Sequence, residues 1–483
     1  MAKAYMGLHF DDQGNLLDAI EQEIILTSLL DTDRPLTDLW LFAHGWNTSE
    51  ESADATYDTW VKRMQERIEQ EHMDTAYHPA FVGIYWPSLA WASGNANIAR
   101  QVPPPISPMV HNMEPGEFEL DTVPFERDNA EHGLGDVNEV TSSMFSLPIA
   151  FKPRGQARFI EAYRAAMDPR GEHGQHYDQD FARLYEVMWQ TQRPTPSQIE
   201  EFVQILSCYK VDDPHCDPSE IANILDAPER VAASLNAEFT PSLSSAYEGF
   251  PTENILLSFF RVFTFWTMKG RAAIIGQNGV ATFLWTVKKT LQQYNRNVRL
   301  HLFGHSFGAK LVSATVYSLA DKPDMKAPLV NTLILLLGAF SQYSFSNHIP
   351  IEGGGTGRYA TLIDRHFVAN PIVAIYSRYD LANKEMYPLG MRLADPSKVY
   401  EIQDRFGAIG ANGAQGLDAT FYRDLEMQPL ERSYNWSTLI ESTCLNIDGQ
   451  RFINADKNKR PAGSHGDFEH PEIFHLSLAI SRQ

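Results

Sequence analysis

The sequence of 483 residues predicts an α/β fold: a mostly parallel, doubly wound sheet that carries a large helical insertion. The first observation is alternation, because short apolar runs recur along the chain and segments with helical periodicity separate most of them. The second is an interruption between residues 88 and 250, where strand signals disappear. The third is composition, since 43% hydrophobic residues are enough to bury a large core.

The apolar runs place the expected strands on both sides of the interruption. They lie near residues 4–10, 39–43, 80–85, 298–303, 330–337, 371–377 and 441–447. Alternating strands and helices of this kind typically form one parallel sheet with helices on both faces. We therefore expect residues 1–87 and 251–483 to form one core.

Residues 88–250 are expected to be helical. Two helix start signals stand out, TPSQ at residues 195–198 and DPSE at residues 217–220. Each joins a capping side chain, a proline at the first helical position and a Gln or Glu at the third. Ligands of open α/β sheets bind beyond the carboxyl ends of the strands, so we expect a cap or lid over that edge. The alternative is an independent helical domain that serves protein contacts.

The segment Gly304-His305-Ser306-Phe307-Gly308 carries the strongest functional signal. It lies between an expected strand and an expected helix, the context that a G-x-S-x-G nucleophile elbow requires. The glycines permit a sharp turn, and the serine hydroxyl is then exposed at its apex. The positive end of the following helix faces that oxygen. The pattern predicts a serine nucleophile.

A second motif, HGWN at residues 44–47, follows the apolar run 38–43. With the serine motif, the sequence DRFGAIGANGA at residues 404–414 and the tail GSHGD at residues 463–467, it resembles the α/β-hydrolase superfamily, in particular bacterial serine-esterase-like and lipase-like members. The resemblance leaves the insertion unmatched. It implies an oxyanion hole made by the backbone amides of Trp46 and Phe307, each donor worth roughly 3 kcal/mol of barrier. The alternative interpretation of HGWN is an ordinary turn at the end of a strand. His44 is a secondary candidate for a site residue.

An acid and a base are expected downstream, in the order Ser, Asp or Glu, His. Asp380 comes just past the apolar run 371–377, where a carboxylate can orient a histidine. Glu385 is the nearest alternative. Asp380 also suits a simpler role, since Asp is a common helix N-cap.

The C-terminal stretch supplies the candidate bases. His465 lies in a Gly-Ser-rich loop after the last apolar run, where the resemblance places the catalytic histidine. His470 precedes Pro471 and is the alternative, whereas His475 falls on the expected last helix. The spacing of these histidines and Glu469 matches no known zinc helix, so we expect neither a metal nor a cofactor.

Composition narrows the partners and the location. The net charge of −21 disfavours nucleic acid and anionic membranes, which attract clustered Lys and Arg. A run of 18 apolar residues is missing from the sequence, so we expect no membrane span. The three cysteines are isolated and the N-terminus lacks the apolar stretch of a signal peptide, which favours the cytoplasm. The oligomeric state is not encoded in these patterns.

Together these features predict a serine hydrolase that cleaves a small-molecule carboxylic ester, thioester or amide through Ser306, His465 and Asp380. An acyltransferase with the same three residues differs in the acceptor alone. A catalytically idle hydrolase fold that binds a ligand or a protein through the insertion is the alternative from another class.

Overall fold

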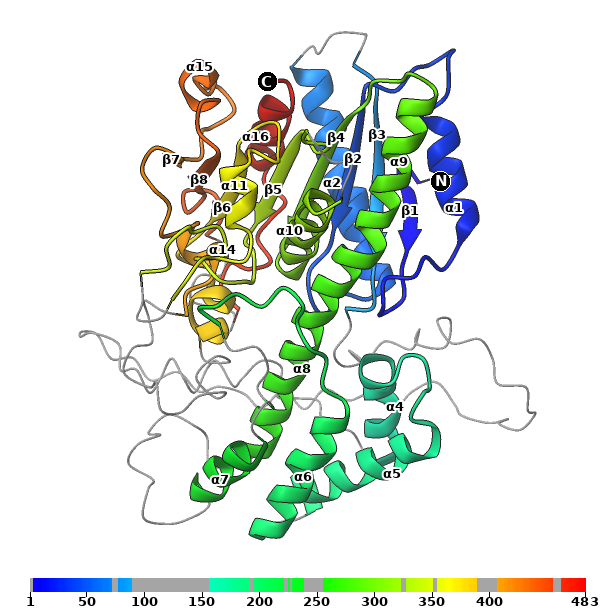
Figure 1. The fold of residues 1–483 in the computed structure, drawn as a ribbon, viewed down its shortest axis with the longest axis vertical. Coiled ribbons are helices and arrows are strands. Elements are labelled where there is room, and N and C mark those ends of the chain that lie inside the picture. Colours follow the sequence, from blue (N-terminus) through cyan, green and yellow to red (C-terminus); the bar gives the residue numbers. More distant parts are fainter. Residues whose placement is uncertain are drawn as a thin grey trace, which may run out of the picture.

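The computed structural model describes residues 3–71, 77–88, 156–190, 194–220, 225, 228–238, 255–322, 327–350, 354–388, 406–454 and 462–483. The described strands form one eight-stranded sheet in which every neighbouring pair is parallel, in the order β1-β3-β2-β4-β5-β6-β8-β7 (Figure 1). The strands are β1 (Met6–His9), β2 (Asp38–Ala43), β3 (Pro79–Tyr85), β4 (Arg299–His305), β5 (Thr332–Leu336), β6 (Ile372–Tyr376), β7 (Tyr422–Glu426) and β8 (Cys444–Asp448). The expected α/β class with a parallel sheet is confirmed.

The seven expected strands are all present, and the sequence missed β7. This strand pairs with β8 at the edge of the sheet, and its five residues are exposed or partly exposed. Its sequence, YRDLE, therefore contains no apolar run. Strands that are covered on both faces read as apolar runs, whereas an edge strand in contact with water does not.

The described helices vary widely in length. They are α1 (Ala19–Ser28), α2 (Glu50–Gln70), α4 (Gln156–Met167), α5 (Gly174–Tyr185), η2 (Glu186–Gln190), α6 (Pro196–Cys208), α7 (Pro228–Glu238), α8 (Ile255–Ile274), η3 (Ile275–Val280), α9 (Ala281–Gln293), α10 (Phe307–Ala320), α11 (Ala360–Asp364), η4 (Ala382–Met386), α14 (Ile409–Asn412), α15 (Trp436–Leu439) and α16 (Pro471–Ser481). Among them, none combines the length and the apolar character that a membrane crossing requires.

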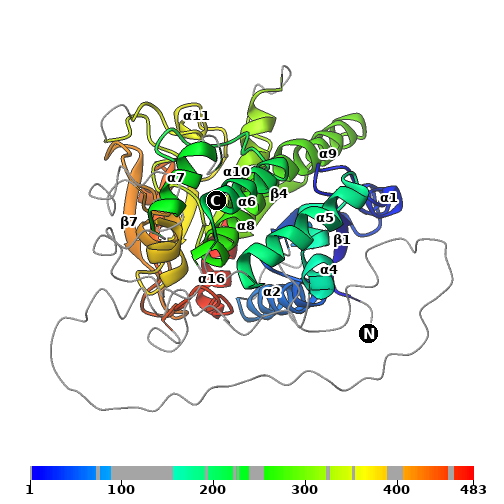
Figure 2. The ribbon, with the colours of Figure 1, turned by 90° about the horizontal axis from the view of Figure 1, so that it is seen from below.

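Helices cover both faces of the sheet, and alternate strand side chains enter two separate cores. In β2, Leu39 and Leu41 face the core that α9 and α10 cover. Trp40 and Phe42 face the other core, beneath α2 and α16. Figure 2 shows these two helix pairs on opposite sides of the sheet. This period of two is the consequence of a pleated strand that is buried on both faces.

The described part of residues 88–250 contains helices and no strand. Helices α4 to α7 gather at one end of the molecule, and α8, η3 and α9 continue from them along the sheet (Figure 1). The helix start expected at residues 195–198 is confirmed by a reciprocal capping box between Thr195 and Gln198. At the second expected helix start, residues 217–220 form a turn and no helix. Residues 89–155 and 239–254 lie outside the described part of the structure, and so does the expected boundary at residue 250.

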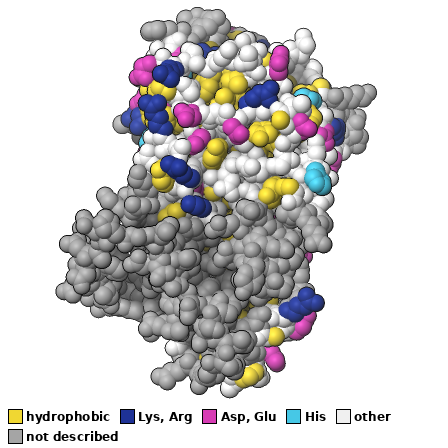
Figure 3. Space-filling view, turned by 90° about the vertical axis from the view of Figure 1, so that its left-hand side faces the viewer, with side chains coloured by type: hydrophobic (Ala, Val, Ile, Leu, Met, Phe, Trp, Pro, Cys, Tyr) yellow, Lys and Arg dark blue, Asp and Glu magenta, His cyan; other side chains and the backbone are white. Residues whose placement is uncertain are grey.

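One side of the molecule, seen in Figure 3, carries positive and negative side chains that are interspersed over its described part. On the described part of that face, charges of one sign are therefore not separated from those of the other.

Candidate active site

Ser306 occupies a sharp turn between β4 and α10. Its backbone has φ 57° and ψ −121°, a strained conformation for a residue with a side chain. The neighbouring glycines have no room for a Cβ, which at Gly304 would lie 2.3 Å from the Gly308 carbonyl oxygen and at Gly308 2.2 Å from that of Ala43. The Ser306 amide donates to the Leu336 carbonyl at 3.0 Å, so adjoining strands hold the strained turn.

His465 joins Ser306 to Asp380. Its Nε2 lies 2.9 Å from Ser306 Oγ, and its Nδ1 lies 2.9 Å from Asp380 Oδ2. A carboxylate acceptor at Nδ1 fixes the proton on that nitrogen and leaves Nε2 free to accept the serine proton. The Asp380 side chain is fully buried, whereas that of His465 is 19% exposed. The imidazole can therefore be reached from solvent while its carboxylate partner is shielded.

Asp380 makes contacts that suit both roles considered from the sequence, a partner for a histidine and a helix N-cap. Its Oδ1 accepts the backbone N–H of Asn383 at 3.1 Å, which caps the start of η4. Its Oδ2 accepts from the His465 ring and also from Asn383 Nδ2, at 2.6 Å. The alternative acid, Glu385, falls within η4, but its side chain lies outside the described part of the structure.

A short antiparallel bridge between Asp380 and Gly463 brings the histidine loop to the acid. The Ser464 amide donates to the Tyr379 carbonyl at 2.8 Å. Gly463 has φ 57°, and a Cβ there would lie 2.3 Å from the same carbonyl oxygen. A glycine at position 463 is thus required by this close contact.

The other candidate histidines have different partners. His470 pairs with Asp467 at 2.8 Å, and His475 pairs with Glu71 at 2.7 Å. His44 donates from Nδ1 to the Gly45 carbonyl at 3.0 Å, and burial lowers its pKa to about 4. His44 is therefore neutral near pH 7 and stabilises the loop after β2.

The two residues expected to provide oxyanion donors lie beside Ser306. Phe307 is the first residue of α10, where backbone N–H groups have no acceptor within the helix. Trp46 follows Gly45, at which a Cβ would lie only 2.9 Å from Ser306 Cβ. The loop after β2 is therefore in contact with the serine turn. The Trp46 and Phe307 rings have centroids 6.1 Å apart.

An aromatic side chain from α8 lies over these two residues. The half-buried Phe265 ring has its centroid 4.9 Å from that of Phe307 and 5.5 Å from that of Trp46. It also contacts Tyr387, which follows η4, at 5.9 Å. Aromatic rings from four distant segments thus pack together next to the serine.

Sequence reasoning missed the residues that support the acid. Asn383 Nδ2 donates to the Leu337 carbonyl at 2.8 Å as well as to Asp380. A Cβ at Gly410 would lie 2.2 Å from that same nitrogen, so part of the 404–414 segment packs directly behind the acid. The one sequence signal was the spacing Asp-x-x-Asn, which is typical of a capped turn. The segment's role could not be read from its glycines.

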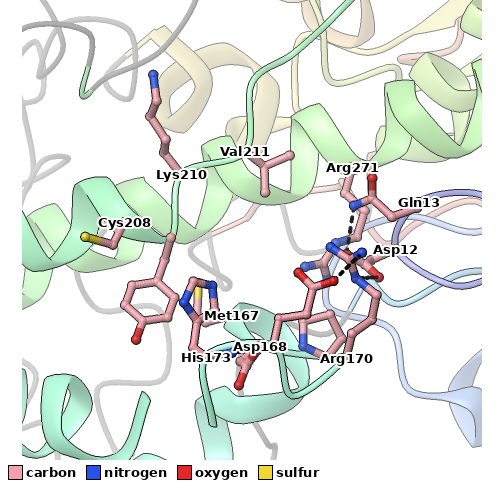
Figure 4. A pocket seen from close by; sticks show the side chains of 13 residues that line it. Asp12, Gln13, Met167, Asp168, Arg170, His173, Cys208, Lys210, Val211 and Arg271 are labelled. Atoms are coloured by element: carbon pink, nitrogen blue, oxygen red, sulfur yellow. Dashed lines mark hydrogen bonds and ion pairs between the residues drawn. The ribbon is translucent and has the colours of Figure 1, made fainter. Parts of the chain in front are cut away.

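A polar cavity of about 200 Å³ lies elsewhere, where the turn after α4 meets the loop after β1 (Figure 4). The residues that line it do not include Ser306, Asp380 or His465. Arg170 pairs with two carboxylates of this cavity, Asp12 at 3.2 Å and Glu172 at 2.8 Å. Arg271 donates to the Pro87 and Ala166 carbonyls at 2.9 and 2.6 Å. These contacts join the helical region to the sheet.

No family model, no curated protein and no solved structure matches the chain. A function for the protein therefore has to be inferred from the geometry of its own residues. The contacts among Ser306, His465 and Asp380 are the most informative part of that geometry.

Proposed function

We propose that the protein is a serine hydrolase of the α/β-hydrolase type, which cleaves a small-molecule carboxylic ester, thioester or amide. One observation supports the proposal most strongly. The His465 ring lies between Ser306, at a strained turn, and the buried Asp380, with Nε2 2.9 Å from the serine Oγ and Nδ1 2.9 Å from the carboxylate Oδ2. Acyl transfer by a serine needs a hydroxyl as nucleophile, an imidazole that takes its proton and a carboxylate that orients the imidazole.

In the proposed reaction, Ser306 Oγ attacks the carbonyl carbon and its proton passes to Nε2 of His465. Asp380 stabilises the imidazolium that forms. The backbone amides of Trp46 and Phe307 donate to the oxyanion of the tetrahedral intermediate. His465 then returns the proton to the leaving group as the acyl–oxygen, –sulfur or –nitrogen bond breaks. In the second half of the reaction, His465 takes a proton from water as the water oxygen attacks the acyl carbon. The bond between that carbon and Ser306 Oγ breaks, Oγ regains the proton from His465, and the carboxylic acid is released.

The topology supports the hydrolase type of fold. All the described strands run in one direction, so their carboxyl ends share an edge of the sheet. The loops after β2, β4, β6 and β8 supply the oxyanion residue, the serine, the acid and the base, respectively. The chain order Ser, Asp, His is also that of this fold. Ligands of open parallel sheets bind at the same edge.

The decisive experiment is labelling with a fluorophosphonate, which reacts with activated serines. We expect the wild-type protein to be labelled once per chain and to lose ester turnover in step. Ser306→Ala removes the labelling and lowers kcat by about 10⁶-fold. The matched control is Ser313→Ala. Ser313 lies on α10, the helix that begins directly after Ser306, and its hydroxyl donates to the backbone carbonyl of Ala309 one turn earlier.

Wild-type protein that stays unlabelled while folded would end the proposal, and so would labelling that survives Ser306→Ala. Aryl esters of increasing acyl length, assayed with and without added alcohol or thiol, identify the acyl group. The same assays separate hydrolysis from transfer, because transfer yields a new ester or thioester in place of the free acid.

A further inference from the structure

His305 lies between Gly304 and Ser306, and its side chain reaches the loop that carries His465. Its Nε2 is 3.0 Å from the backbone carbonyl oxygen of His465. A carbonyl oxygen only accepts, so His305 Nε2 carries the proton and donates it, and Nδ1 is unprotonated in the neutral ring. The residue before the serine is thus hydrogen-bonded to the backbone of the proposed base.

The His305 ring is held firmly in this position. Only 7% of the residue is exposed. Its ring packs against those of His465 and Phe468, with centroid distances of 4.9 and 4.4 Å. On another side, a Cβ at Gly45 would lie 3.0 Å from His305 Nδ1. The imidazole therefore contacts both the loop after β2 and the loop after β8.

His305 is also neutral at working pH. Burial lowers its pKa well below the usual range, and His465 and His44 lower it further. A second positive ring beside His465 would oppose the imidazolium that forms during acyl transfer. A neutral ring can donate a hydrogen bond at this distance without that penalty.

Two backbone contacts of the histidine loop close to His465 are to the acid side of the site. Gly463 pairs with Asp380, and the Ser464 amide donates to Tyr379. Those contacts can preserve the bond between His465 and Asp380 without fixing the distance to Ser306. His305 supplies a contact from the serine side, because it belongs to the turn that carries Ser306.

We infer that His305 is a positioning residue for the general base: its Nε2–H holds the backbone of His465 where the His465 ring reaches Ser306 Oγ. The inference depends on the proposed function. His305 has no role as acid, base or nucleophile, and it acts through His465 alone.

Two variants separate the hydrogen bond from the packing. His305→Phe keeps an aromatic ring and removes the donor, whereas His305→Gln places an amide N–H near the position of Nε2. We expect His305→Phe to lower kcat and the rate of fluorophosphonate labelling by about 100-fold, because a misplacement near 1 Å has that effect. KM stays within about twofold, and His305→Gln recovers kcat to within about tenfold of wild type.

The loss of kcat caused by His305→Phe must also disappear when the His465 side chain is absent. In a His465→Ala background, His305→Phe should change the residual rate by less than about twofold, since two residues that act as one unit are not additive. If His305→Phe fails to fold, as judged by thermal unfolding, His305→Met takes its place as the variant without a donor.

The outcomes are distinct. Wild-type rates in the variant without a donor would overturn the positioning role, as would equal losses in the Phe and Gln variants or a full loss in the His465→Ala background. Each of these leaves the proposed function intact as long as wild-type Ser306 is labelled. Unlabelled wild-type protein overturns both.

Discussion

Two clusters of buried polar side chains meet helix α10. The first contains Ser306, at the N-cap, with His465 and Asp380. The second, here called the ionic cluster, includes Lys310, about one turn into α10. The complete ionic cluster consists of Asp213, Glu220, Lys269 and Lys310, whose side chains are all at most 2% exposed. Both clusters join segments that are far apart in the sequence.

The ionic cluster is fully balanced. Lys310 contacts Asp213 at 2.8 Å, and Lys269 contacts Glu220 at 2.6 Å and Asp213 at 3.2 Å. Burial by itself raises the pKa of the Asp213 carboxyl, but Lys310 and Lys269 overcome this and lower the pKa to about 2. Glu220 further accepts the Ser341 amide at 3.0 Å and the Tyr387 hydroxyl.

The serine cluster differs in that its imidazole is partly exposed and its serine has a strained backbone. In the proposed reaction a proton moves along the serine cluster, whereas in the ionic cluster every charge is neutralised in place. Buried polarity by itself therefore does not indicate catalysis. The acids at residues 213 and 220 pair with lysines of α10 and α8, so this part of the expected insertion is joined to both helices by ion pairs.

After Ser306→Ala, the largest expected effect is that of replacing the acid of the serine cluster. Asp380→Asn leaves the shape of the side chain but allows the wrong His465 tautomer, so we expect kcat to fall by about 10⁴-fold. Steady-state turnover of an activated ester measures this loss. The matched control is Glu385→Gln, which should retain turnover. If Glu385→Gln is the variant that fails instead, the acid has been assigned to the wrong residue.

The ionic cluster should respond in stability. Lys310→Met leaves Asp213 with a single cationic partner, and removing one member of a buried pair typically costs about 3–5 kcal/mol. Urea unfolding measures the change. Lys62→Met is the control, because that side chain is 75% exposed and an exposed replacement changes the free energy of unfolding by about 0.5 kcal/mol or less.

Kinetics of the same Lys310→Met protein test the comparison directly. The fraction that remains folded should hydrolyse esters at a rate within about threefold of wild type, since Lys310 takes no part in proton transfer. A large fall in kcat with unchanged unfolding would mean that the two clusters have been distinguished wrongly.

The sequence could predict the sheet and most of the serine cluster because the backbone there restricts the residue type. Strands buried on both faces must be apolar, and the turn at Ser306 excludes any Cβ at Gly304 and Gly308. The choice between His465 and His470 could not be derived in the same way. It depends on the bridge between Gly463 and Asp380, a contact between two loops.

The ionic cluster could not be predicted. Asp213 and Glu220 read as ordinary charges beside a helix start signal, and Lys310 reads as one lysine in a helix. Their pairing depends on the tertiary packing of α8 and α10 against residues 213–220. No local spacing encodes such a contact. The same limit explains why Asn383, which holds the acid, was missed.

Acid should destabilise the protein through its buried histidines before it affects Asp213. Burial lowers the pKa of His44 to about 4; burial, assisted by Lys310, lowers that of His215 to about 4. The unfolded chain then binds more protons than the folded protein between pH 6.5 and 4. Stability is complete above pH 6.5 and falls as the pH decreases towards 4, by up to about 3 kcal/mol for each histidine.

Urea unfolding at pH 7.5 and pH 5 measures this loss. His215→Gln should reduce the difference between the two pH values, because an amide does not titrate. His348→Asn, at an exposed position, is the control and should leave the difference unchanged. If His215→Gln has no effect on the difference, the acid-sensitive group near Lys310 is a different one.

The smallest expected effect concerns Asn383. Its side-chain N–H groups donate to Asp380 and to the Leu337 carbonyl, so the acid of the serine cluster has fixed partners, as the charges of the ionic cluster do. Asn383→Ala removes the side-chain donor to Asp380 but keeps the backbone N–H that caps η4. We expect kcat to fall about tenfold with little change in KM, close to the value of one hydrogen bond to a charged group. Asn412→Ala is the matched control, because Asn412 donates to Gln342. Wild-type kcat in Asn383→Ala would mean that the backbone contacts of Asp380 are sufficient to orient it, and that full pairing is a property of the ionic cluster alone.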